Sequence, residues 1–196
     1  MREIELVFDG RAFPAASVTN HLITVSGRSN GRRWTASKPL AFWRTFAELE
    51  LTDDAIAGWV ARYGDIKSAL APGRSVDTTG WEQLALILAL VARAWTKPDD
   101  PDGISYIKGE IDAAAIADAA RRDVDAPVIF GPSFEPFVHA ARLRDFMLVS
   151  ASFMLRDKTP MRRCAECRHW TAASHAATRY CSNTCRLKAM RKREAA

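Results

Sequence analysis

Residues 164–185, CAECRHWTAASHAATRYCSNTC, contain all four cysteines of the chain. Two residues separate Cys164 from Cys167, three separate Cys181 from Cys185, and thirteen lie between the two pairs. This spacing is typical of one zinc ion bound by four thiolates. The second pair shares one face of a helix or of its first turn, where the helix dipole favours negative sulfur. We therefore predict that these four cysteines bind one Zn²⁺.

The cysteines also have other interpretations. Free cysteines occur in protein cores as small apolar residues, and a closely spaced pair can be redox-active. His169 and His175 are competing zinc ligands, although we expect them at the surface or beside the site; His169 would replace a cysteine that did not bind. Four thiolates leave no open coordination position, which favours a structural ion over a catalytic one. The segment is too short to bury a core of its own, so the metal should supply its folding energy.

Positive charge is concentrated in the same part of the chain. The 196 residues carry a net charge of +5. Residues 156–196 hold eleven of the Lys and Arg residues and three acidic residues, so the remainder is net acidic. This shift predicts a boundary near Arg156. We expect an N-terminal domain over residues 1–155, suited to sensing or to forming a homodimer, and a zinc finger with a basic C-terminal helix over residues 156–196.

The run after Cys185 combines good helix formers with dense positive charge. A positive patch fixed beside a metal site predicts contact with a nucleic-acid backbone, DNA in preference to RNA. The alternatives are a solvated chain end, an anionic protein or a membrane surface, although this helix lacks the aromatic face that membrane insertion favours. The candidate nucleic-acid-binding residues are Arg163, Arg168, Arg179, Arg186, Lys188, Arg191, Lys192 and Arg193.

Four apolar or aromatic residues near the cysteines carry further expectations. Leu187 and Met190 lie three apart on the predicted helix and can cover the metal module. Trp170 and Tyr180 are expected to form a small hydrophobic plug for that module, with stacking on an unpaired base as the alternative.

Residues 1–155 predict an α+β fold that is mainly α. Residues 3–35 have the pattern of strands, with a hairpin turn at Asp9-Gly10. Helices are expected from about Pro39, after a cap at Thr52, over 80–95 with a cap at Thr78 or Thr79, over 112–122, and over 137–156. The apolar run 84–92 should be buried at the centre, and residues 127–136 should be irregular. Five of the tryptophans are expected in the core: Trp34, Trp43, Trp59, Trp81 and Trp95.

Composition and motifs exclude several classes of protein. Hydrophobic residues make up 48% and charged residues 26% of the chain, which excludes wholesale disorder. No apolar run reaches the roughly 18 residues of a membrane span, and no secretory signal opens the chain, so we expect a cytoplasmic, reducing environment. Residues 1–155 contain no phosphate-binding loop, no dinucleotide motif and no cysteine, and His21 and His139 are isolated. We therefore expect no enzyme.

The runs Cys164-Ala-Glu-Cys167 and Arg179-Tyr180-Cys181-Ser182, followed by Cys185 and a basic helix, resemble the bacterial CGNR-type zinc finger over residues 160–193. That family places the finger behind a mostly helical N-terminal domain, and its members are regarded as stress-induced transcription regulators. The sequence departs from the family at residues 185–188, which read CRLK in place of CGNR, and at Tyr180, where a Trp is common.

The resemblance implies a treble-clef finger and a role in regulating transcription by binding DNA. The alternative function is a protein-interaction module, in which the finger docks an acidic partner and the basic helix steers the encounter.

Overall fold

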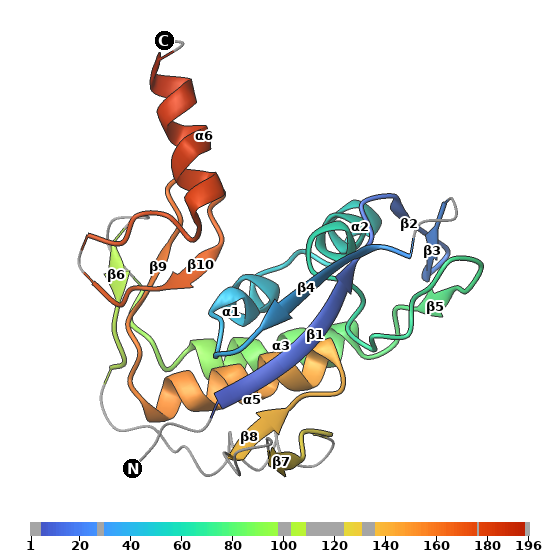
Figure 1. The fold of residues 1–196 in the computed structure, drawn as a ribbon, viewed down its shortest axis with the longest axis horizontal. Coiled ribbons are helices and arrows are strands. Elements are labelled where there is room, and N and C mark those ends of the chain that lie inside the picture. Colours follow the sequence, from blue (N-terminus) through green and yellow to red (C-terminus); the bar gives the residue numbers. More distant parts are fainter. Residues whose placement is uncertain are drawn as a thin grey trace.

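The computed structural model describes residues 5–26, 30–97, 103–108, 124–130, 136–175 and 177–194. It has mixed α and β content, as expected (Figure 1). The helices are α1 (Phe42–Ala47), α2 (Asp53–Arg62), α3 (Trp81–Ala92), α5 (Leu143–Arg156) and α6 (Asn183–Glu194). The strands are β1 (Glu5–Ala12), β2 (Ala16–Thr19), β3 (Leu22–Val25), β4 (Arg32–Ala36), β5 (Val76–Asp77), β6 (Ile104–Ser105), β7 (Val128–Phe130), β8 (Pro136–His139), β9 (Met161–Arg163) and β10 (Trp170–Ala172).

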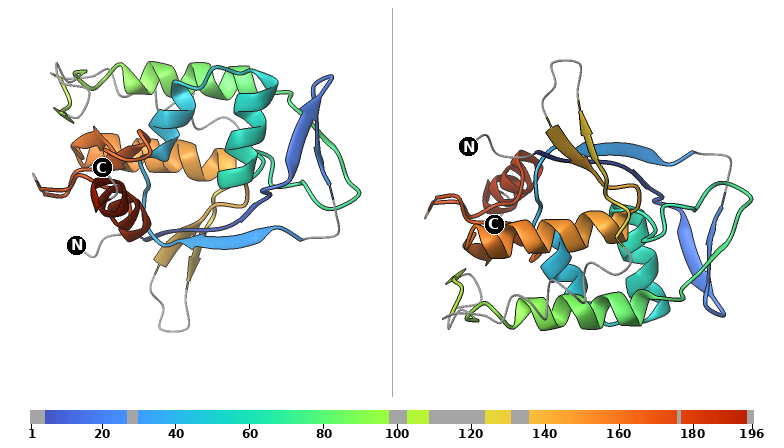
Figure 2. Two further views of the ribbon diagram at one scale, coloured as in Figure 1. Left: turned by 90° about the horizontal axis from the view of Figure 1, so that it is seen from above. Right: turned by 90° about the horizontal axis from the view of Figure 1, so that it is seen from below.

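The largest sheet has the strand order β4-β1-β8-β7. Strand β1 pairs antiparallel with β4 and parallel with β8, so the two ends of the first 140 residues meet in one sheet. Alternate side chains of β1 are buried, and α5 packs against that strand. Helices α1 and α2 lie between α5 and α3 on the same side of the sheet (Figure 2). A separate three-stranded sheet, β2-β3-β5, lies beside α2.

The predicted turn at Asp9-Gly10 is wrong, because β1 continues through both residues. The reason lies in the neighbouring strand. The indole of Trp34 packs so closely on Gly10 that a Cβ atom there would lie 2.5 Å from the ring. Glycine at this position therefore admits a large side chain against the strand, which is one of the uses of glycine inside a sheet.

Residues 127–136 are not wholly irregular, since β7 and β8 pair antiparallel there. The last helix of the N-terminal part begins at Leu143 and not at Phe137, because Phe137 lies in β8 beside β1. The amide N–H of Leu143 donates to the Ser68 hydroxyl at 3.0 Å. The helix predicted over 112–122 lies outside the described residues.

Two helix caps test the sequence predictions. Thr52 caps α2 as expected, accepting a hydrogen bond from the Ala55 N–H at 3.3 Å. Neither Thr78 nor Thr79 caps α3; the N-cap is Gly80, which has a φ of 87° that favours glycine. The apolar run of α3 is also less buried than expected, because Leu86 is 61% and Leu90 is 44% exposed.

The core is dense in aromatic rings. Phe146 of α5 lies with its ring centroid 5.2 Å from Phe8 and 5.8 Å from Phe42. The Trp34 ring packs on the same group, with its centroid 5.2 Å from that of Phe8. Trp34 is only partly buried, and its Nε1–H donates to the Tyr63 carbonyl at 3.0 Å. The other four tryptophans predicted in the core are buried there: Trp43, Trp59, Trp81 and Trp95. Within the described residues, no helix has the length and apolar character needed to cross a bilayer.

Candidate metal centre

Strands β9 and β10 form an antiparallel hairpin, and α6 follows it (Figure 1). We call the described residues from Met161 to Glu194 the metal module, and the part built from α1, α2, α3, α5 and the large sheet the body. The module's sheet is completed by β6, which comes from before residue 155 and pairs with β9. The sheet beside the cysteines therefore draws strands from both sides of the boundary predicted near Arg156.

The hairpin and helix bring all four cysteines together. Cys164 follows β9, Cys167 lies in the turn, Cys181 precedes α6, and Cys185 is in the first turn of α6. Their sulfur atoms all lie within 4.8 Å of one another. Cys181 Sγ lies 3.6 Å from Cys167 Sγ and 3.5 Å from Cys185 Sγ. Four sulfurs around a tetrahedral ion with bonds of about 2.3 Å would be spaced by about 3.8 Å, so the cluster has the dimensions of a metal site.

Backbone and side-chain donors point at the sulfurs. The Cys181 N–H donates to Cys164 Sγ at 3.4 Å, and a guanidinium N–H of Arg62 donates to Cys167 Sγ at 3.4 Å. At the start of α6, the Ser182 hydroxyl accepts from the Cys185 N–H at 3.2 Å, which caps the helix that carries the last ligand. Such donors stabilise thiolate sulfur and orient the ligands.

The thiols cannot all ionise easily on their own. The contact with Cys181 lowers the pKa of Cys167, and the same contact raises the pKa of Cys181. Burial raises the pKa of Cys185. Cys181 Sγ is in contact with both Cys167 Sγ and Cys185 Sγ, and a bound cation is the charge that would allow all three to be thiolates.

The two histidines considered as alternative ligands are not part of the sulfur cluster. His169 is beside the cluster, with its Nδ1 2.6 Å from the Tyr63 hydroxyl, and burial lowers its pKa. His175 is exposed. Among the described residues, the group of side chains placed to hold a metal ion consists of the four cysteines, as the sequence spacing predicts.

The body supports the metal centre through residues that sequence reasoning missed. Arg62 and Tyr63, at the end of α2, contact Cys167 and His169 from more than a hundred residues away in the chain. Nothing in the local pattern around Arg62 signals a metal site. Only the three-dimensional arrangement identifies these two residues as its neighbours.

A second contact joins α1 to the module. Glu48 Oε2 accepts from an Arg163 guanidinium N–H at 2.6 Å and from Trp170 Nε1–H at 3.0 Å. The Arg44 guanidinium lies 3.6 Å from the centre of the Trp170 ring. Trp170 is buried, as a plug would be, and its ring is therefore closed to the stacking on bases that was the alternative.

The candidate nucleic-acid-binding residues fall into three groups. Arg163 pairs with Glu48 at the junction with the body, and about a third of its side chain is exposed. Lys192 pairs with Glu166 at 2.7 Å, and Arg193 donates to the Tyr180 hydroxyl at 2.7 Å, both at exposed positions. The other candidates are exposed: Arg168, Arg179, Arg186, Lys188 and Arg191.

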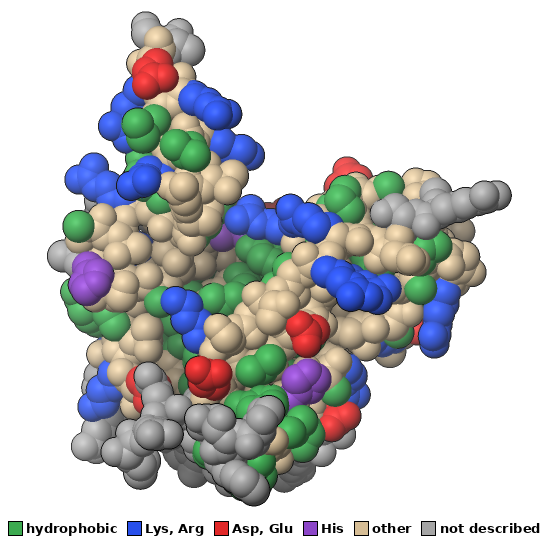
Figure 3. Space-filling view, viewed as in Figure 1, with side chains coloured by type: hydrophobic (Ala, Val, Ile, Leu, Met, Phe, Trp, Pro, Cys, Tyr) green, Lys and Arg blue, Asp and Glu red, His purple; other side chains and the backbone are tan. Residues whose placement is uncertain are grey.

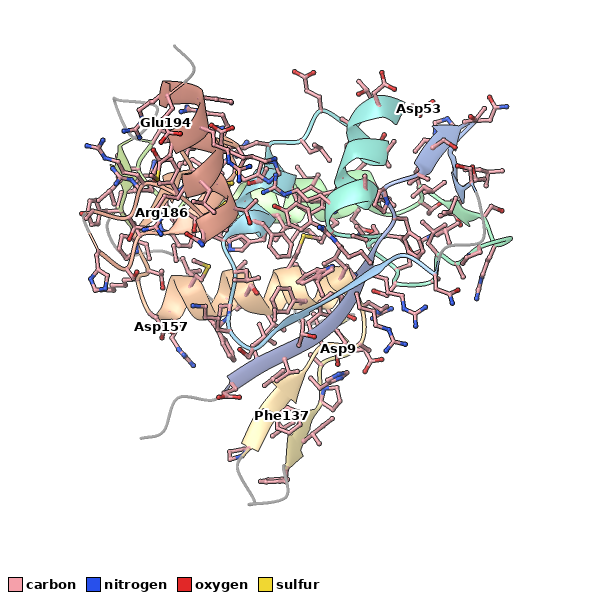
Figure 4. All side chains as sticks on the ribbon, turned by 45° about the horizontal axis from the view of Figure 1, so that its top comes forward. Asp9, Asp53, Phe137, Asp157, Arg186 and Glu194 are labelled. Atoms are coloured by element: carbon pink, nitrogen blue, oxygen red, sulfur yellow. The ribbon has the colours of Figure 1, made fainter. Side chains whose placement is uncertain are left out.

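Helix α6 projects from the body with blue side chains on the face seen in Figure 3 and with Arg186 near its base in Figure 4. Cys185 is the buried residue of this helix. Leu187 and Met190 are 42% and 46% exposed, which is contrary to the expectation that they cover the metal module. The first turn already places Cys185 against the other sulfurs, and the helix then leads away from the module.

Comparisons with known protein families, with curated proteins and with solved structures give no match to this chain. The resemblance to the CGNR-type finger stays a prediction, and the function has to be argued from the site itself.

Proposed function

We propose that the four cysteines bind one structural zinc ion, and that this ion fixes a treble-clef finger whose basic helix binds DNA in a regulatory protein. The observation that carries the proposal is the position of Cys185. Cys185 supplies the last sulfur of the cluster, and it is also the buried residue in the first turn of a basic helix whose other side chains face solvent.

Zinc is favoured by the chemistry of the donors. Soft thiolate ligands select zinc or iron–sulfur clusters, and a four-sulfur set spaced for a tetrahedron suits a single zinc ion. No coordination position stays open to a substrate when four sulfurs are bound, so the role we assign to the ion is structural. The first cysteine pair forms a knuckle at the turn between β9 and β10, and the second pair leads into α6, an arrangement that supports the assignment of a treble-clef finger.

The charge on α6 supports binding to a polyanion. The helix has five basic residues and one acidic residue. Arg186, Lys188 and Arg191 are exposed, and within the described residues no ion pair engages them. Lysine and arginine side chains that neutralise phosphates release condensed counterions, which is the main source of affinity for a nucleic-acid backbone.

The shape of α6 favours DNA over RNA. Its twelve residues form a rod of about 18 Å, and the major groove of B-DNA is wide enough to admit an α-helix. The corresponding groove of an RNA duplex is too narrow for side chains to read. In this proposal the body supplies sensing or dimerisation, and the metal module supplies the contact with DNA.

The test measures binding to a mixed-sequence DNA duplex and to the matching RNA duplex at several salt concentrations. The informative variant replaces Arg186, Lys188 and Arg191 with Ala, and a matched control replaces the exposed Arg32, Arg33 and Arg74. We expect the slope of log affinity against log salt to fall by about two to three units in the first variant only. Equal slopes in the two variants, or no binding to either duplex, would refute the proposal.

One observation favours a second candidate, a protein-interaction module. The exposed Leu187 and Met190 place apolar surface among the basic residues of α6, and such a mixed surface suits an acidic protein partner with an apolar patch. This function predicts binding that survives moderate salt and that is weakened by Leu187→Ala with Met190→Ala. The DNA proposal predicts little change from these two substitutions.

A further inference from the structure

A cavity of about 570 Å³ lies at the junction between the body and β6. Its walls come from α1, from the end of α3 and from the two extended segments after α3, which are joined by a bridge between Trp95 and Ile107. This volume is in the range of pockets that bind small molecules. Ala47, Ala89, Ala92 and Trp95 give it an apolar wall.

The decisive residue in the cavity lining is Arg44 of α1. It is only 1% exposed, and its Nε–H has no hydrogen-bond partner in the described structure. A buried guanidinium with an unused N–H carries a cost in free energy, since that donor has lost water and gained nothing. Part of the group is held in place: Nη1 donates to the Ser105 hydroxyl at 3.0 Å, and the guanidinium stacks on Trp170.

Three more cations line the same cavity. Arg93, Lys97 and Lys108 are exposed, and within the described residues none of them forms an ion pair. Burial lowers the pKa of Arg44 to about 10, which leaves it charged at neutral pH. The cavity is therefore strongly positive.

The negative charge near this cavity is smaller than the positive charge of its four cations. Glu48 is the acidic residue of the lining, and its Oε2 already accepts hydrogen bonds from Arg163 and Trp170. The C-terminal end of α3 adds a partial negative charge of about half a unit, which is small beside the four cations.

We propose that this cavity is a binding site for a small organic anion, whose carboxylate or phosphate group is held by Arg44 with Arg93, Lys97 and Lys108. A guanidinium matches planar carboxylates and phosphates better than an ammonium does, because its N–H groups form a fixed fork. The apolar wall would cover the hydrocarbon part of the ligand. The inference goes beyond DNA binding and does not depend on it.

The site also touches the metal module. Arg44 contacts Ser105 in β6 and Trp170 in β10, and both strands belong to the sheet beside the cysteines. An anion on Arg44 would therefore change the surroundings of Trp170 and of Trp95 in the cavity wall, so that binding should alter tryptophan fluorescence.

The test titrates the full chain, loaded with zinc, with inorganic phosphate in one series and citrate in another, at constant ionic strength. Tryptophan fluorescence and calorimetry report binding, and the two series show which anionic group is preferred. The variant is Lys97→Ala with Lys108→Ala, at two exposed positions where loss of folding is not expected. The matched control, Arg32→Ala with Arg33→Ala, removes the same charge from β4.

We expect saturable binding of at least one anion that weakens about tenfold in the Lys97 and Lys108 variant and less than twofold in the control, with zinc content unchanged in both. A second variant, Arg44→Lys, should weaken binding while retaining the charge. The proposal is overturned if neither anion binds saturably up to 10 mM, a concentration at which even a weak site of about 1 mM affinity would be filled. It is also overturned if the cavity variant and the control weaken binding equally.

Discussion

The body and the metal module are stabilised in different ways. The body surrounds a cluster of packed rings, with Phe146 fully buried among Phe8 and Phe42. The module buries few apolar side chains, and Met161 and Trp170 belong to the same core cluster as the body. Hydrophobic packing can therefore hold the body, whereas the module as proposed would depend on an ion bound by its sulfur ligands and on its contacts with the body.

Removal of the metal is expected to have the largest effect, and the two regions should respond to it differently. We expect a chelator, or Cys181→Ser, to abolish zinc binding and to unfold β9, β10 and α6 while the rings of the body stay packed, because structural zinc sites contribute on the order of 10 kcal/mol to folding. Metal analysis and amide hydrogen exchange measure the two effects.

Thr184→Ala, at an exposed position in the first turn of α6, is the control for Cys181→Ser and should keep one zinc per chain. Unchanged exchange protection in α6 after metal removal would contradict the dependence of the module on its ligands. Without them, a twelve-residue helix has little stability in water.

The cysteine spacing was sufficient to predict the cluster, and the Thr52 cap was sufficient to predict the start of α2. Both features are local: the cap and the helix that it starts are adjacent, and the four cysteines lie within 22 residues of one another. The pairing of β6 with β9 and of β1 with β8 joins segments that are far apart in the chain, and neither has a local pattern that identifies its partner. The same holds for Arg44, which in the sequence is one basic residue in a short helix.

A substitution in the body should have the second largest effect. Phe146→Ala is expected to lower the free energy of unfolding by about 3–5 kcal/mol, because it leaves a cavity among closely packed rings. Thermal and denaturant unfolding measure the loss. Leu86→Ala, at a residue that is 61% exposed, is the control and should change stability by less than about 0.5 kcal/mol.

Phe146→Ala should lower the stability of the body without removing zinc from the module. The variant should still bind one zinc per chain at temperatures where it is folded, since the rings that Phe146 packs on, Phe8, Trp34 and Phe42, belong to the body. Loss of zinc from a folded Phe146→Ala protein would show that the two regions are less distinct than their packing suggests.

The smallest effect should come from the junction. Glu48→Ala removes the acceptor for Arg163 and Trp170, and we expect it to weaken docking of the module by about 1 kcal/mol, since Glu48 is one-third exposed and solvent screens the pair. Glu48→Gln keeps an acceptor oxygen and should lose less. Hydrogen exchange in β9 and β10 reports the change.

An effect of Glu48→Ala confined to the body, with β9 and β10 as protected as before, would contradict the role given to this contact. An equal effect of the Ala and Gln variants would show that the acceptor oxygen of residue 48 does not matter.

The pairing of β6 with β9 has a consequence for any fragment of the chain. A finger that carried all of its own strands could be cut free at one point. Here a cut at residue 155 would leave β9 with an open edge, because its partner strand lies in the other half of the chain.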